Sequence, residues 1–112
     1  MPHRDLALLD AARRAVDQVN ALIDRPSGRR LLHLRQLRDA VQFIAANIAE
    51  AFGRGTGRDR ARSLEIARGE TEEVIQHMGA NFRTRRIAPH DYWPIHNRLV
   101  VIVKMVDSFL RR

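Results

Sequence analysis

The residues whose spacing best suits chemistry are Glu73 and His77, a carboxylate and an imidazole four positions apart. On a helix, this spacing places both side chains on one face. A di-iron site in a helical bundle requires instead a Glu-x-x-His step on each of two helices. No Glu in the chain precedes a His by three positions, and a single Glu–His pair supplies too few ligands for a metal. The sequence therefore predicts an ordinary helix pair here, with no metal and no cofactor.

A glycine-rich segment, Gly53-Arg54-Gly55-Thr56-Gly57-Arg58, is the second motif with a chemical interpretation. A phosphate-binding Walker loop carries Gly-Lys-Ser/Thr after a strand, whereas this segment has no lysine and follows a helical pattern. No nucleophile elbow is present either. One group of carboxylates is typical of a solvated helix face. Its members are Glu65, Glu70, Glu72 and Glu73. The sequence therefore predicts that the protein is not an enzyme.

Composition excludes further classes of protein. The chain has 112 residues, a length that suits one domain, and we expect residues 1–112 to form it. It contains no cysteine, so disulfides, thiolate metal ligands and a cysteine nucleophile are excluded. No segment approaches the ~20 apolar residues of a membrane span, and the first residues do not resemble a signal peptide. We therefore expect a cytoplasmic protein that contacts no membrane.

The charge balance is the first positive indication of function. Twenty basic residues against thirteen acidic ones give a net charge of +7, and all the basic residues except Lys104 are arginine. Such a surplus favours polyanions such as nucleic acid, and arginine suits bidentate contacts with phosphate. A GC-rich genome, which enriches arginine everywhere, explains the same surplus. Composition alone leaves both interpretations open.

Apolar residues recur at alternating steps of three and four along four segments, residues 9–23, 34–51, 64–78 and 95–109. Each step pattern is a seam that packs helices at a shallow angle, and no segment alternates with a period of two. The connections are short, which makes neighbouring helices run antiparallel. The predicted fold is all-α, an antiparallel up-down-up-down four-helix bundle.

Glycine and proline residues predict where these helices begin and end. Pro26-Ser27-Gly28 separates the first two helices. We expect Gly53 to be a left-handed C-terminal cap, and Asp59 to be the N-cap of the third helix. The last connection is expected to span residues 87–93, with Pro94 in the first turn of the fourth helix.

The first and fourth helices carry more apolar residues than one seam needs. A broad core face accounts for this surplus, and so does a contact between subunits. We favour the subunit contact. The predicted residues of this homo-oligomer interface are Leu8, Ala15, Val100 and Val103.

The bundle topology gathers arginines at both ends of the rod. Those that close a helix complement its dipole, but the arginines at the start of the second and third helices oppose it. Placement against local stability favours phosphate binding. Tyr92 and Trp93 are the only adjacent aromatic residues, so we expect contacts with the backbone of the nucleic acid and little reading of bases. The predicted nucleic-acid-binding residues are Arg29, Arg30, Arg54, Arg58, Arg60, Arg62, Arg83, Arg85 and Arg86.

Three runs in the middle of the chain are distinctive: Gln36-Leu37-Arg38-Asp39-Ala40, Asn47-Ile48-Ala49-Glu50-Ala51-Phe52-Gly53-Arg54 and Leu64-Glu65-Ile66-Ala67-Arg68-Gly69. Together they resemble the bacterial four-helix-bundle proteins encoded within intervening sequences of 23S ribosomal RNA genes. The resemblance covers residues 34–78, with Ala51 and Glu70 where the family usually has Gly and Ser. The positions that it marks as structural are Asn47, Glu50, Phe52, Gly53, Arg68, Gly69 and Glu73.

The resemblance implies up-down bundles that assemble as homopentamers and are not known as enzymes. A related branch, the accessory proteins of diversity-generating retroelements, binds nucleic acid and the reverse transcriptase. From the residues themselves we hypothesise that Asn47 and Glu50 bridge to Arg38 or Arg68 and fix helix register or a subunit contact. The leading prediction is a non-enzymatic homo-oligomer, expected to be a pentamer, that binds RNA or DNA. The alternative is a structural or protein-interaction scaffold for a protein partner.

Overall fold

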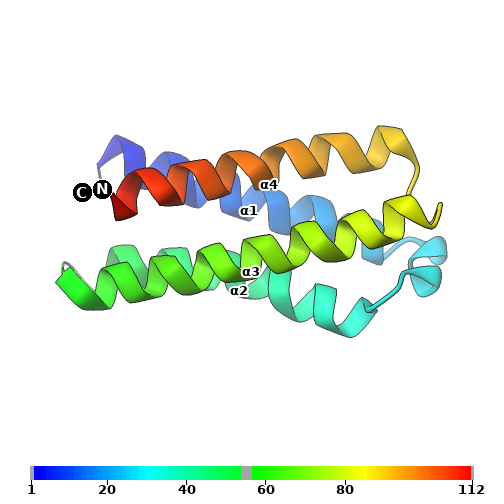
Figure 1. The fold of residues 1–112 in the computed structure, drawn as a ribbon, viewed down its shortest axis with the longest axis horizontal. Helices are drawn as coiled ribbons and strands as arrows, with labels where there is room; N and C mark the ends of the chain where they lie inside the picture. Colours follow the sequence, from blue (N-terminus) through cyan, green and yellow to red (C-terminus); the bar gives the residue numbers. More distant parts are fainter. Residues whose placement is uncertain (1, 54–56, 112) are drawn as a thin grey trace.

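The computed structural model describes residues 2–53 and 57–111, and this part of the chain forms four long helices and no strand. The helices are α1 (His3–Ile23), α2 (Leu34–Gly53), α3 (Gly57–Arg83) and α4 (Pro89–Leu110), and a short 3-10 helix, η1 (Pro26–Arg30), follows α1. They form a rod of 42 × 22 × 20 Å (Figure 1). The prediction of an all-α four-helix bundle is confirmed.

One end of the rod, which we name the terminal end, comprises residues 2–5, 52–53, 57–62 and 108–111. Here Arg4 of α1 donates a 2.8 Å hydrogen bond to Ser108 of α4. The rings of Phe52 and Phe109 lie 5.3 Å apart and join the last turns of α2 and α4. Figure 1 shows both chain termini at this end, together with the end of α2 and the start of α3.

The opposite end, which we name the η1 end, comprises residues 24–33 and 83–91. Arg25, which follows α1, pairs with Asp91 in the first turn of α4 through hydrogen bonds of 2.8 and 3.0 Å. Each of the four helices therefore runs along the rod, and successive helices run in opposite directions, as the blue-to-red colouring of Figure 1 shows.

The surplus apolar residues of α1 belong to the core. Leu8 and Ala15, which we predicted at a subunit interface, are 0% exposed within the single chain. That prediction is wrong for both residues, because no partner reaches them without opening the bundle. The broad core face was the correct alternative for α1. On α4, Val100 and Val103 are half-buried, and Val101 between them is 48% exposed.

Three predicted helix boundaries require correction. Gly53 is the last residue of α2, and among the described glycines the one with a positive φ is Gly57, at 77°. Asp59 lies in the first turn of α3, not at its cap, because the helix already begins at Gly57. Pro89 takes the first position of α4, which leaves Pro94 inside the helix. Either proline has the fixed φ that suits a first turn, so the sequence offered two equivalent starts.

Gly28 holds η1 close against the end of α1. Its N–H donates to the carbonyl of Arg25 at 2.8 Å, and a Cβ at this position would lie 1.9 Å from the carbonyl oxygen of Ile23. Gly28→Ala is therefore expected to lower the free energy of unfolding by about 1–3 kcal/mol, because the backbone must move to relieve the overlap.

Urea denaturation measures this effect, and Gly69→Ala is the matched control. A Cβ on Gly69 meets nothing within 4 Å, so this exposed position in α3 should be neutral or gain stability from the better helix former. Equal midpoints for wild type and Gly28→Ala would contradict the close packing of η1 on α1.

Candidate nucleic-acid interface

Asn81 of α3 fixes the segment that follows η1. Its side chain is 0% exposed, and its Oδ1 accepts a 2.6 Å hydrogen bond from the N–H of Leu32. Its Nδ2 donates to the carbonyl of Leu32 at 3.2 Å and to that of His77 at 2.8 Å. One amide thus pairs with both backbone polar groups of Leu32. The arginines of η1 are held in place by this contact.

A second contact joins η1 to the connection between α3 and α4. Arg86 Nε donates a 2.9 Å hydrogen bond to the carbonyl of Arg30. Arg85 has a left-handed backbone with φ 61°, which turns the chain after α3. The structure therefore brings together five of the arginines predicted to bind nucleic acid. They are Arg29, Arg30, Arg83, Arg85 and Arg86, all exposed.

The acidic groups of the η1 end are already paired. The hydrogen bonds from Arg25 hold the pKa of Asp91 below its usual value. Asp24 lies 3.8 Å from Arg38 across the connection to α2. Within residues 2–53 and 57–111, no carboxylate oxygen lies within 4.0 Å of the other guanidinium groups at this end. The result is a concentrated positive charge presented by Arg29, Arg30, Arg83, Arg85 and Arg86.

At the terminal end, the charge of Arg60 is used inside the bundle. Its Nη2 lies 3.3 Å from Oδ1 of the buried Asp5. The guanidinium also lies 5.0 Å from the ring centre of Phe52 and 5.6 Å from that of Phe109. An arginine placed in this way satisfies a buried carboxylate and packs on aromatic faces. Arg60 is therefore less available to phosphate than its neighbours.

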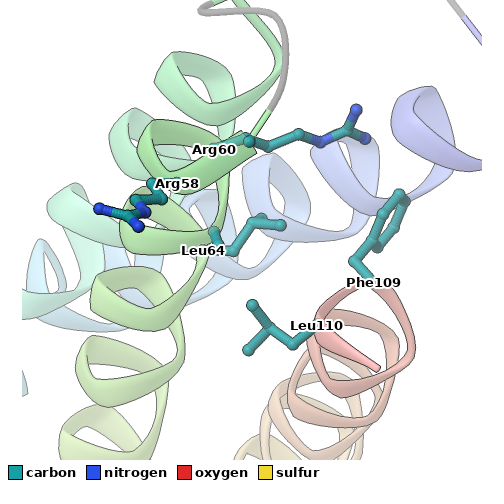
Figure 2. Close-up of a pocket in the computed structure, with 7 residues that line it drawn as sticks. Arg58, Arg60, Leu64, Phe109 and Leu110 are labelled. Carbon is teal, nitrogen blue, oxygen red and sulfur yellow. The ribbon is translucent and has the colours of Figure 1, made fainter. Parts of the chain in front are cut away.

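Arg58 and Arg62 are exposed one turn apart on α3. Arg58 borders a depression of about 500 Å³, which Leu64 and Leu110 line from below, while Arg58 and Arg60 extend to opposite sides (Figure 2). Its lining is arginine and apolar side chains, without a carboxylate or an imidazole. Arg54, also predicted to bind nucleic acid, lies outside the described residues.

Glu73 and His77 share one face of α3, with 3.6 Å between Oε1 and Nε2, but this separation is longer than a hydrogen bond, and within the described residues the buried Nε2 has no hydrogen-bond partner. The His77 ring also lies 5.1 Å from that of His33. Glu70 is close by, and both its burial and the charge of Glu73 raise its pKa. Across the described ranges, no three His, Asp or Glu side chains are arranged to hold a metal ion.

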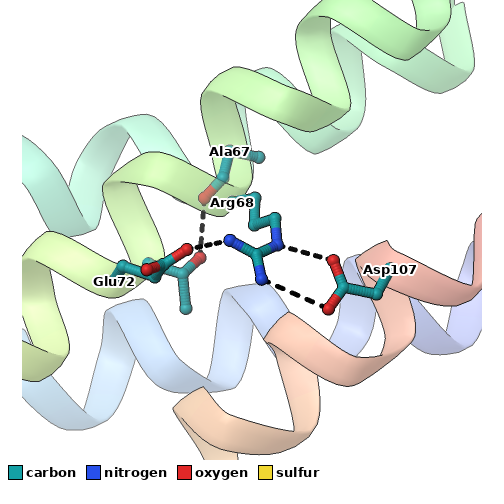
Figure 3. A network of polar contacts seen from close by, with 5 residues as sticks. Ala67, Arg68, Glu72 and Asp107 are labelled. Atoms are coloured by element: carbon teal, nitrogen blue, oxygen red, sulfur yellow. Dashed lines mark hydrogen bonds and ion pairs between the residues drawn. The ribbon is translucent and has the colours of Figure 1, made fainter. Parts of the chain in front are cut away.

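Arg68, one of the positions marked by the resemblance, connects α3 to α4. Its Nε and Nη2 lie 2.5 and 3.4 Å from the two carboxylate oxygens of Asp107, and its Nη1 contacts Glu72 (Figure 3). These hydrogen bonds hold the pKa of Asp107 below its usual value. Arg68 thus has a structural role between helices.

The predicted bridge from Asn47 to Arg38 or Arg68 is wrong. Asn47 Nδ2 instead donates a 2.9 Å hydrogen bond to the carbonyl of Phe43, one turn earlier in α2. Arg38 and Arg68 have carboxylate partners elsewhere. Glu50 lies on the exposed side of α2.

The Arg68–Asp107 pair predicts a pH-dependent stability. Because folding lowers the pKa of Asp107, the pair stabilises the fold above the ordinary aspartate pKa and is lost as the pH falls through the lowered value. Asp107→Asn should therefore reduce the melting temperature at pH 7, and the difference from wild type should close below about pH 4.

Melting curves between neutral and acidic pH check this expectation. Asp10→Asn is the control, because Asp10 pairs with Arg14 within one exposed helix turn and should change the melting temperature little at any pH. A difference for Asp107→Asn that persists unchanged in acid would rule out the ion pair as its cause.

Helix order and charge distribution define the chain as a small, basic four-helix bundle. None of its described helices combines the length and apolar character needed to cross a membrane. The chain belongs to the 23S rRNA-intervening sequence protein family, whose model matches residues 4–108. This confirms the resemblance that its central motifs indicated.

A solved structure agrees with this assignment. The crystal structure of a protein with unknown function from the S23 ribosomal protein family of Bacteroides thetaiotaomicron is similar to the chain, with a TM-score of 0.82 and 26% sequence identity. The match covers 97% of this chain and 99% of that one. Among curated proteins, none matches the chain significantly.

Proposed function

We propose that this protein is a non-enzymatic homo-oligomer that binds RNA or DNA in the cytoplasm, chiefly through the phosphate backbone at the η1 end. The observation that carries the proposal is the positive cluster there, which comes from η1, the end of α3 and the turn before α4. Both nearby carboxylates are already engaged by Arg25 and Arg38. A cluster of uncompensated guanidinium groups attracts phosphates and contacts them bidentately. Arg58 and Arg62 supply a second, smaller group at the terminal end.

The oligomeric part of the proposal is supported by the outer face of α4. Val101 is exposed, and Val100 and Val103 line an apolar groove of about 340 Å³ together with Ile75 of α3. The family resemblance makes a homopentamer the assembly to test, by measuring the mass of the particle in solution. In such a ring, each basic end would be repeated around one axis, which would raise the local potential.

Binding to a labelled structured RNA and to a duplex DNA, titrated from about 50 to 200 mM salt, tests the proposal. The affinity is expected to fall steeply with salt, since each neutralised phosphate releases counterions. Weak binding to both at low salt, by protein shown to be assembled, would favour the scaffold alternative. The exposed apolar side chains Phe43 and Ile66, on α2 and α3, are the feature that favours that alternative.

A further inference from the structure

Four aromatic rings form a cluster beside the arginines of the η1 end. Phe82 of α3 and Tyr92 of α4 stack with 4.1 Å between ring centres and 2° between planes. Trp93 meets both rings edge-on, at 5.6 and 4.9 Å. His96 lies 5.4 Å from both Tyr92 and Trp93, and its Nδ1 is 3.2 Å from the Tyr92 hydroxyl. The indole is thus held by three neighbouring rings.

Trp93 is the exposed member of this cluster. Tyr92 is buried, whereas 47% of Trp93 is accessible to solvent. The rings behind it restrict its rotamers, so little side-chain entropy would be lost when a ligand covers it. A rigid, half-exposed indole is the kind of surface on which a nucleobase stacks.

Arg83 joins this cluster to the positive charge. A Cβ placed on Gly79 would lie 2.9 Å from Arg83 Nη1 and 3.9 Å from the Tyr92 hydroxyl oxygen. The missing side chain at Gly79 therefore lets the guanidinium lie close to the aromatic rings. The exposed indole and the arginines that attract phosphate share one end of the rod.

We propose that Trp93 is a stacking platform for an unpaired base, so that the ligand of the η1 end is single-stranded nucleic acid, not a duplex. This inference rests on the proposed function. Arg83 and its neighbouring arginines would contact the phosphates that flank the stacked base. Bases inside a duplex have both faces covered by their neighbours, and only splayed or unpaired bases stack on side chains. The positive charge of the η1 end favours a polyanion as the ligand, and the exposed indole favours a polyanion with unpaired bases.

Trp93 is the only tryptophan of the chain, so its fluorescence reports on stacking directly. Oligouridylate or oligothymidylate is expected to quench the emission as it binds. A duplex and an abasic oligonucleotide of equal charge should bind with little quenching, since neither presents a free base. Equal quenching by all three ligands would contradict the proposal that Trp93 stacks on an unpaired base.

Variants of Trp93 separate stacking from phosphate binding. Trp93→Leu keeps an apolar side chain against Phe82 but has no aromatic face, and it should weaken single-strand binding about tenfold while duplex binding is unchanged. Trp93→Tyr should restore most of the affinity. Phe43→Leu is the matched control, because Phe43 is a comparably exposed aromatic residue, at 51%, on another helix.

The outcomes separate this inference from the proposed function. Wild-type affinity in Trp93→Leu, or a changed oligomer mass in that variant, would overturn the platform and leave phosphate binding intact. Failure of the wild-type protein to bind any nucleic acid at low salt would overturn both.

Discussion

Asn81→Leu is expected to lower the free energy of unfolding by about 2–4 kcal/mol, one of the largest effects that we expect of a single substitution in this chain. Leucine has the same number of side-chain heavy atoms and the same branching as asparagine, and a somewhat larger volume, so the substitution leaves no cavity. It leaves the N–H and the carbonyl of Leu32 without the amide that pairs with both. Each of these two backbone groups is expected to cost about 1–2 kcal/mol when it loses its partner, in the lower part of the usual range because Leu32 is half-buried.

Urea denaturation gives the size of this effect, and amide exchange at Leu32 gives its location. Asn47→Leu is the matched control, because within the described residues the Asn47 side chain bonds to the backbone of its own helix, so this substitution should change stability little. Asn81→Asp keeps an acceptor for the N–H of Leu32 but buries a carboxylate against the carbonyl oxygens of Leu32 and His77, so at neutral pH it should lose at least as much stability as Asn81→Leu. Wild-type stability in Asn81→Leu, with slow exchange at Leu32, would show that the amide is dispensable.

The second large effect is expected from reversing the charge of Arg29, Arg30 and Arg85 together. Changing all three to glutamate should reduce affinity for RNA and DNA about 10²–10³-fold at low salt and remove about 3 units from the slope of log affinity against log salt. Repulsion of phosphate replaces attraction at each of the three positions. None of these side chains pairs with a carboxylate elsewhere in residues 2–53 and 57–111, so folding should be preserved.

A triple variant of equal net charge distinguishes a site from bulk electrostatics. Arg13, Arg14 and Lys104 are exposed along the middle of α1 and α4, away from both ends of the rod. Changing these three to glutamate should cost far less affinity than the change at the η1 end. Equal losses would show that net charge alone drives binding. Changing Arg58 and Arg62 to glutamate measures how much the terminal end contributes to the affinity for nucleic acid.

The sequence predicted the helices well because the spacing of apolar residues is a local property. Helix boundaries were less certain, since Pro89 and Pro94 both suit a first turn and only the packing of α4 selects one. Asn81 was missed although it occupies the next position of the α3 seam, three residues after Met78. A polar residue in a seam signals a special contact, but the sequence does not say that its partner is the backbone of Leu32, 49 residues earlier.

The electrostatic roles of the arginines could not be predicted from the sequence either. Arg60 and Arg58 are two residues apart and look equivalent in the sequence. Only the folded bundle places Asp5 and two phenylalanine rings against Arg60. In the same way, the exposure of Trp93 and the burial of Tyr92 depend on how α4 rests on Phe82. The clustering of arginines at the two ends of the rod could be predicted from the topology, whereas the availability of each guanidinium group to a ligand could not.

The hydrogen bonds between Asn81 and Leu32 have a consequence for the conditions in which the η1 end keeps its shape. By joining positions 32 and 81, they close a long loop of the polypeptide, a task that many small proteins give to a disulfide. The chain contains no cysteine, so this closure is made without a covalent bond, by the hydrogen bonds of Asn81 and the packing of the buried Leu31. A reducing agent does not break this contact, whereas a denaturant that competes for its hydrogen bonds does. The arginines of the η1 end therefore keep their arrangement whatever the redox state of their surroundings.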